Sequence, residues 1–258
     1  YEMSFKKLNA SDKIFYFINY AVLALVLCAT LYPFVYILSA SVSDSGPLGR
    51  GEVWLLPKGF SLEAYKSVLN DNTIWMHYGN TIWYVVVGTC VNIFMTTITA
   101  YPLSRKNFSA RNTIMMIIAF TMFFSGGLVP TYLLVRNLGL LDSRWAIIIP
   151  AAISTWNLII MRTFFEGIPE SLHEAAKIDG CSEFRILLTI IIPLSIPVIA
   201  VMVLFYAVAY WNSFFTAMMY LNDPKKYPLQ IYLRKILIQY EQQDILQDVQ
   251  QGRDVIAQ

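Results

Sequence analysis

The side chains in this sequence that are suited to binding a polar molecule are amides, indoles and phenols set in or beside long apolar runs. Tyr and Trp combine an apolar ring with a polar tip, so they suit stacking on a sugar ring and bonding to its hydroxyls. A buried amide is costly unless it is paired, so the alternative is that these residues bond neighbouring helices together. The candidates for a solute path are Asn92, Trp156, Asn157, Tyr210, Trp211 and Asn212.

Catalytic and metal-binding groups do not gather at a recognisable spacing in the sequence. It contains no carboxylate pair, nucleophile triad or metal-ligand cluster, and no phosphate loop of the G-x-x-x-x-G-K type. His77, expected in a loop, and His173, expected to be exposed, lack companions for metal or acid–base chemistry. The three cysteines are expected to be free thiols. We therefore expect this chain to have no enzyme activity, cofactor or metal of its own, and to draw energy from another protein.

A polar break between two apolar runs, residues 166–189, carries its own folding signals. Pro169 suits the first turn of a helix, and Gly180 is a natural cap at its end. Ser182 then caps a second helix. Helical spacing places four residues on one face of the first helix: Leu172, Ala175, Ala176 and Asp179. The pattern predicts a helix, a tight turn and a second helix, a short rigid element suited to docking into the groove of a partner protein.

The composition places this segment in a membrane protein. Of the residues, 57% are hydrophobic and 14% are charged, against about 25% charged in average soluble domains. Apolar runs of about 20 residues or more are long enough to span a bilayer. The net charge of +2 is too small to indicate nucleic acid. We expect an all-α integral membrane bundle, one transmembrane domain over residues 1–258, with an external loop at 39–77 and spans at about 14–38, 80–101, 113–135, 145–165 and 190–210.

The basic residues predict the orientation, because cytosolic loops are enriched in Lys and Arg. Basic residues cluster before the first span, in the loop at 102–112 and in the segment at 166–189. These three parts are therefore expected in the cytosol, and five spans leave the C-terminal side outside. Arg162, at the end of the fourth span, is expected to reach lipid headgroups or, alternatively, to pair with another subunit.

One set of residues in the polar segment carries a family resemblance. Glu174-Ala175-Ala176, Asp179-Gly180 and Ile192-Pro193-Leu194 together resemble the EAA loop of ABC-importer permeases. In that family the loop is a coupling helix that seats in the ATPase subunit. The resemblance implies polar contact by Glu174, close approach at the two alanines, a turn at Gly180, and apolar knobs at two positions. The implied ATPase-coupling residues are Leu172, Glu174, Ala175, Ala176, Asp179, Gly180 and Phe184. Asp179 is expected to bond backbone amides at the turn.

Further stretches extend the resemblance over nearly the whole chain. Residues 125–132, 157–165 and 210–215 are similar to the maltose-permease-like carbohydrate permeases, in the branch of LplC/YtcP-like permeases. The resemblance implies a multi-pass subunit of the type I importer kind in a bacterial cell membrane, importing oligosaccharides or polysaccharide fragments. It also implies a second, unlike permease subunit, two cytosolic ATPase subunits that bind ATP and Mg²⁺, and an extracellular solute-binding lipoprotein. Five spans are visible in the sequence, and the resemblance implies a sixth.

Two other classes of protein remain open. An ion-coupled secondary transporter would need ionisable residues at the middle of the bilayer. The centres of the five predicted spans contain none. A non-transporting membrane scaffold is disfavoured only by the coupling motif.

Overall fold

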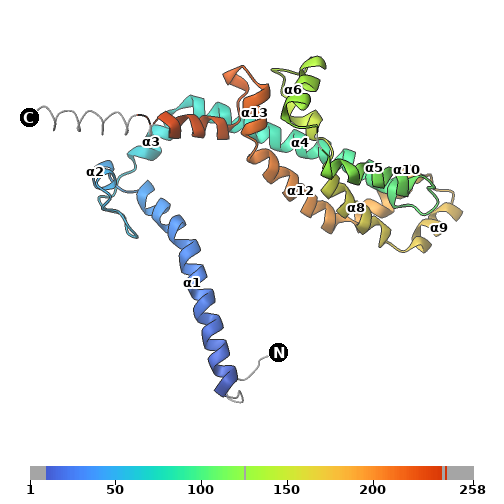
Figure 1. Ribbon diagram of the computed structural model, residues 1–258, viewed down its shortest axis with the longest axis horizontal. Helices are drawn as coiled ribbons and strands as arrows, with labels where there is room; N and C mark the ends of the chain where they lie inside the picture. Colours follow the sequence, from blue (N-terminus) through green and yellow to red (C-terminus); the bar gives the residue numbers. More distant parts are fainter. Residues whose placement is uncertain (1–9, 125, 240–241, 243–258) are drawn as a thin grey trace, which may run out of the picture. The chain divides into compact units, whose positions relative to one another are not determined.

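The computed structural model describes residues 10–124, 126–239 and 242, and in these residues the chain is built from helices (Figure 1). The one β-type pairing within them is an isolated bridge between Ser43 and Phe60. The expected all-α fold is confirmed. The chain divides into two units, residues 1–72 and 73–258, and each is described by itself.

The first unit contains a long apolar helix and a folded loop. Helix α1 (Ala10–Ser41) contains the predicted first span, and apolar side chains lie on every face of it, as in a membrane-spanning helix. The loop that follows carries α2 (Ser45–Gly49) and α3 (Glu63–Asn70). Its middle returns to the end of α1, where the Ser39 hydroxyl donates to the Leu55 carbonyl at 2.6 Å. Residues 42–65 of the predicted loop at 39–77 are therefore ordered around the end of α1, whereas its last residues, from Asn72 on, belong to α4.

The second unit is built on α4 (Asn72–Ser104), which contains the predicted second span. Helices α1 and α4 are the two helices within the described residues that are long and apolar enough to cross a membrane unaided. His77 lies on α4 and is 3% exposed, so its prediction as a loop residue was wrong. Its ring stacks on Tyr232 at 4.9 Å between centroids, and Nδ1 lies 2.8 Å from the Tyr227 carbonyl oxygen. The polar sequence around His77 indicates a loop, but contacts with residues 150 positions away extend the helix.

The third, fourth and fifth predicted spans are each bent pairs of helices, not straight rods. Helices α5 (Arg111–Phe123) and α6 (Leu128–Asn137) meet at 116°. Helix α7 (Trp145–Ile148), continued by η2 (Ile149–Ala151), meets α8 (Thr155–Glu166) at 50°. The segment of α10 (Glu183–Ile186), the π-helical turn η3 (Leu187–Ile191) and α11 (Ile192–Leu194) meets α12 (Ile196–Trp211) at 82°. If each pair is one span, the described chain has up to five spans.

Glycine and proline explain two of these breaks. Gly127, before α6, has φ +84°, a conformation that side chains disfavour, so the helix cannot pass through it. Pro197 follows the break at Ser195 and lacks the N–H that a continuous helix would need. Ser125-Gly126-Gly127 and Pro130 predict an irregular helix in the third span, but the bend angles cannot be read from the sequence.

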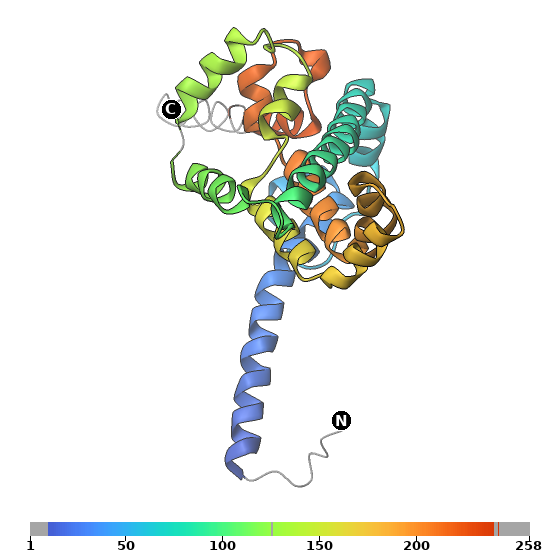
Figure 2. The ribbon, with the colours of Figure 1, turned by 90° about the vertical axis from the view of Figure 1, so that its right-hand side faces the viewer.

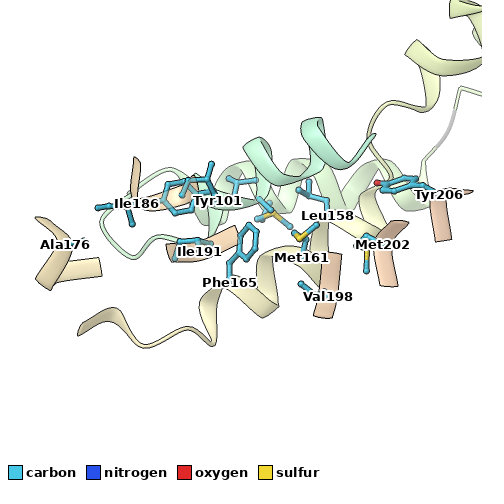
Figure 3. Packing of buried hydrophobic residues seen from close by; sticks show 14 residues of the cluster. Tyr101, Leu158, Met161, Phe165, Ala176, Ile186, Ile191, Val198, Met202 and Tyr206 are labelled. Atoms are coloured by element: carbon cyan, nitrogen blue, oxygen red, sulfur yellow. The ribbon is translucent and has the colours of Figure 1, made fainter. Parts of the chain in front are cut away.

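Helix α8 lies at the centre of the main core, beside α5 and α12 (Figures 1 and 2). Its Leu158, Met161 and Phe165 are completely buried. Figure 3 shows these side chains gathered with Tyr101 of α4 and Met202 of α12. The same cluster includes residues from the polar segment that follows α8, so that segment is rooted in the core of the second unit.

A second group of contacts joins the turn before α7 to the loop after α13 (Phe215–Tyr220). Asp142, at φ +55°, has a carboxylate that accepts from the Lys226 ammonium at 2.9 Å and from the backbone N–H groups of Asn222 and Asp223. These bonds hold the pKa of Asp142 at about 2. The short helix η4 (Pro224–Lys226) follows, and a further helix covers residues 229–239. The sequence after Pro228 predicts an amphipathic stretch up to Gln258, and most of it lies outside the described residues.

Candidate coupling segment and candidate solute path

The polar segment folds as the sequence predicts, into a helix, a glycine turn and a second helix. Helix α9 (Glu170–Ile178) ends in a Schellman motif, in which the N–H of Cys181 donates to the Ala176 carbonyl and that of Gly180 to the Lys177 carbonyl, both at 3.0 Å. Gly180 has φ +77°. The Ser182 hydroxyl accepts from the Arg185 N–H at 3.4 Å and caps α10. Within the described residues the Asp179 carboxylate forms no hydrogen bond, so the expected bond to the turn amides is not formed.

Helix α9 has one buried face and one exposed face, and they differ in part from the sequence-based expectation. His173 is 5% exposed, so its prediction as an exposed histidine was wrong. Ala176 is 6% exposed and packs in the main core, so its small side chain serves close packing inside this chain. The exposed side carries apolar residues of the kind that docks in a groove, including Ile178 at 87%, which was not predicted. The predicted coupling residues that are exposed at or beside α9 are Leu172, Glu174, Ala175, Asp179 and Gly180, and Phe184 is exposed on α10.

One carboxylate, Glu183, ties this segment to the spans. Its Oε2 accepts from the Tyr101 hydroxyl at 2.7 Å and lies 2.9 Å from His173 Nε2. Its Oε1 pairs with the Lys177 ammonium at 2.8 Å. Burial opposes ionisation of Glu183, but the hydrogen bonds from Lys177, His173 and Tyr101 outweigh it and lower the pKa to about 2. Because Tyr101 belongs to α4 and the other two to α9, this carboxylate, on α10, joins three helices.

Further bonds attach the beginning of the segment. Lys106, in the loop after α4, pairs with Glu170 of α9 at 3.0 Å. Arg162 donates from Nε to the Leu103 carbonyl at 2.8 Å and pairs with Glu166 at 2.6 Å. The expectation that Arg162 reaches headgroups or another subunit stays a prediction, and the sequence did not indicate these two partners within the chain. The beginning of α9 is thus fastened to the loop that follows α4, and its later part to α4 itself through Glu183.

Three of the six candidates for a solute path line one cavity. This cavity, of about 290 Å³, is lined by residues of α4, the break before α8, and α12. Asn92 donates to the Ala151 carbonyl and accepts from the Tyr210 hydroxyl, both at 2.9 Å. Asn157 is 6% exposed, and within the described residues its side-chain amide has no hydrogen-bond partner. Its amide is thus available to a molecule in the cavity.

The other three candidates do not line this cavity. Trp156 is 60% exposed and Trp211 is 36% exposed. Asn212 is exposed and donates to the Val208 carbonyl one turn back at 2.9 Å. Sequence reasoning missed Tyr206 as a wall of the cavity, where its hydroxyl lies 2.8 Å from Thr96 Oγ1. Tyr206 belongs to an apolar run in the sequence, and only its burial against α4 in the structure identifies it as a residue that lines the cavity.

Replacement of Gly88 tests the contact between α4 and α12 that forms this cavity wall. A Cβ at Gly88 would lie 2.5 Å from the Tyr210 ring, so Gly88→Ala pushes the ring away and strains its bond to Asn92. Overpacking of this kind costs about 1–3 kcal/mol. We expect a lower unfolding temperature for the purified complex. Gly79→Ala, on the same helix with open space around it, is the control and is expected to raise that temperature slightly, because alanine favours a helix interior over glycine. Equal unfolding temperatures for both variants would show that Tyr210 does not pack closely here.

These features define a membrane-spanning transport permease: apolar spans, most of them bent, and a fastened helix–turn–helix that exposes Glu174-Ala175 and Asp179-Gly180. Residues 92–246 match the family model described as the binding-protein-dependent transport system inner membrane component, and the chain belongs to this family.

Relatives in this family indicate the branch. The chain is 42% identical over 227 residues to the polygalacturonan/rhamnogalacturonan transport system permease protein YtcP of Bacillus subtilis, covering 88% of this chain and 79% of that protein. It is 45% identical over 228 residues to protein LplC of the same species, covering 88% and 77% of the two chains. A crystal structure of a bacterial ABC transporter involved in the import of the acidic polysaccharide alginate contains a chain that matches with a TM-score of 0.86 and 40% identity, over 88% of this chain and 81% of that one.

Proposed function

We propose that this chain is one permease subunit of an ABC importer that carries oligosaccharides or polysaccharide fragments. The observation that carries the proposal is the α9 segment: it exposes apolar and acidic residues on one side and is fastened to α4 through Glu183 on the other. A helix that is exposed on one side and rigidly anchored on the other can transmit the movement of a partner protein to the spans. The similarity to a polygalacturonan/rhamnogalacturonan permease and to an alginate importer supports the substrate class.

The mechanism that we infer is alternating access driven from outside this chain. The partner ATPases bind ATP and Mg²⁺ and close, and α9 follows them as a near-rigid body. Through Glu183 and the main core the displacement reaches α4 and α8, which carry walls of the solute cavity. In physical terms, the permease exchanges between two states, and both ATP on the cytosolic side and the loaded binding protein on the external side shift the equilibrium between them.

The surroundings of the subunit follow from the same proposal. It sits in the bacterial cell membrane, with the loop at 102–112 and the α9 segment in the cytosol. It pairs with a second, unlike permease subunit, and an extracellular solute-binding lipoprotein delivers the sugar. An ion-coupled transporter is less well supported, because the charged residue in the five predicted spans, Arg162, lies near a span end and is bonded to Leu103 and Glu166.

ATP hydrolysis by the complex, purified through a tag on this chain, tests the proposed function. We expect an ATPase and a second permease to co-purify, and sugar-loaded binding protein to raise hydrolysis. Glu174→Lys reverses an exposed charge at the docking face. Charge changes at interfaces cost about 2–5 kcal/mol, so a loss of about thirtyfold or more in ATPase affinity is expected. The control, Glu63→Lys, reverses an exposed carboxylate on α3 and is expected to behave as wild type. Purification without an ATPase, with no effect of Glu174→Lys, would refute the importer assignment.

A further inference from the structure

Two hollows on the surface of the second unit meet at one end of α4. The first, of about 580 Å³, is lined almost entirely by apolar side chains of α4, η3 and α12. The second, of about 480 Å³, lies at the loop after α4 and includes the side chains of Arg105, His173 and Lys177. Ile98, Phe184 and Leu187 line both hollows. The two therefore form one continuous groove, apolar along its length and basic at one end.

The apolar part has the dimensions of a lipid chain. Its lining on α4 runs from Val85 to Ile98, which is about 20 Å at 1.5 Å per residue. Half of the hydrocarbon core of a bilayer is about 15 Å thick.

The basic end holds a cation without an acidic partner. Arg105 bonds to Ser104 Oγ at 3.3 Å and to the Phe165 carbonyl at 3.4 Å, and its guanidinium lies 5.0 Å from the centre of the Tyr101 ring. Within the described residues no carboxylate lies within ion-pair distance of it. Arginine has five N–H donors, so several remain for a phosphate. Glu183 also lines this end, but Lys177, His173 and Tyr101 already occupy its oxygens.

We propose that this groove binds an anionic phospholipid, with its phosphate at Arg105 and one acyl chain along α4 between Ile98 and Val85. The lipid comes from the leaflet nearest the loop at 102–112, which is the cytosolic leaflet in the proposed orientation. Basic pockets between helices on this side of a membrane are suited to anionic headgroups. A purely apolar helix of a partner subunit would fill the apolar part but leave the guanidinium unsatisfied. The proposal does not depend on which solute is carried.

Lipid retention by the assembled complex tests the proposal. The complex is placed in nanodiscs of phosphatidylcholine with phosphatidylglycerol, extracted with delipidating detergent, and analysed for retained phospholipid by mass spectrometry. We expect wild type to retain phosphatidylglycerol in preference to phosphatidylcholine. Arg105→Gln removes the phosphate contact, and Ile98→Trp fills the junction of the two hollows at a side chain that is 40% exposed. Each is expected to lower retention about tenfold or more, because one charge-assisted contact, or the chain site itself, is lost.

Two matched controls keep the test specific. Arg111→Gln removes a cation at the first residue of α5 that does not line the groove, and Ile117→Trp enlarges an apolar side chain of α5 that is 60% exposed. Both are expected to retain lipid as wild type does. If Arg105→Gln fails to assemble, Ile98→Trp decides the question. Equal retention in all five proteins overturns the proposal. So does cross-linking of Cys90, in the apolar part, to the second permease in a complex that retains no phosphatidylglycerol.

Discussion

A permease with Glu183→Gln is expected to assemble with its ATPases and still lose most of its transport. Glutamine keeps an acceptor for the Tyr101 hydroxyl but removes the charge that pairs with Lys177 and faces His173. Hydrogen bonds to charged groups contribute about 1.5–3 kcal/mol each, less where water screens them, as at this half-exposed carboxylate. Loss of two such contacts loosens α9 from α4, and we expect sugar uptake per ATP hydrolysed to fall about tenfold.

Uptake and hydrolysis measured together in proteoliposomes check this expectation. Glu52→Gln is the matched control, because Glu52 also pairs with two cations, Arg50 at 2.7 Å and Lys58 at 3.6 Å, but lies in the first unit. It is expected to transport normally. If Glu183→Gln and wild type import the same amount of sugar per ATP, the carboxylate is not the link between α9 and the spans.

The pH dependence of stability gives Glu183 an independent signature. Its pKa is lowered from 4.5 to about 2 in the folded chain. The carboxylate therefore stabilises the fold above about pH 4.5, and this contribution disappears as the pH falls toward 2. We expect the difference in unfolding temperature between wild type and Glu183→Gln to shrink over this range.

Gly180→Ala is expected to separate the permease from its ATPases. At φ +77° an alanine costs about 1–3 kcal/mol, although no atom stands within 4 Å of the new Cβ. The strain is relieved when the turn opens, which breaks the hydrogen bonds to Ala176 and Lys177 and redirects the end of α9. Since α9 carries the proposed docking face, we expect ATPase co-purification to fall about tenfold or more.

Gly139→Ala provides a control with the same backbone strain in a different turn. Gly139 has φ +68° and also has open space around its Cβ position. Both variants are expected to lower the unfolding temperature by a similar amount, and only Gly180→Ala to lose ATPase. Equal loss of ATPase from both would mean that general instability, and not the direction of α9, sets the binding of the ATPase.

Local signals explain what the sequence could predict. Pro169, Gly180 and Ser182 act on their immediate neighbours, so the helix–turn–helix could be foreseen and is confirmed. The apolar runs indicate how much chain can lie in a membrane. They carry no information on direction, so the bends of 116°, 50° and 82° could not be predicted.

Contacts between distant residues explain what was missed. Tyr101 lies 82 positions from Glu183, and no pattern in either segment joins them. His173 was placed on the wrong face of α9 because a polar residue in a short polar loop is ordinarily exposed, and only its bond to Glu183 makes burial favourable. Among the path candidates, Asn92, Asn157 and Tyr210 meet in one cavity, whereas Trp156, Trp211 and Asn212 have the same chemistry but other positions.

The pairing of Asn92 has a consequence for affinity. Its amide already bonds the break before α8 and the Tyr210 hydroxyl of α12, and the nearby Tyr206 hydroxyl already bonds Thr96. A sugar that bonds to Asn92, Tyr210 or Tyr206 must replace a bond that these groups already make, so their net contribution to affinity is small. Of the three predicted path residues in the cavity, only Asn157 can bond the sugar without breaking an existing hydrogen bond within the described residues. The sugar therefore stays in the cavity only briefly, and the cavity discriminates weakly between different sugars. In the proposed mechanism, tight discrimination between sugars then falls to the binding protein, and a conformational change can release a weakly held sugar.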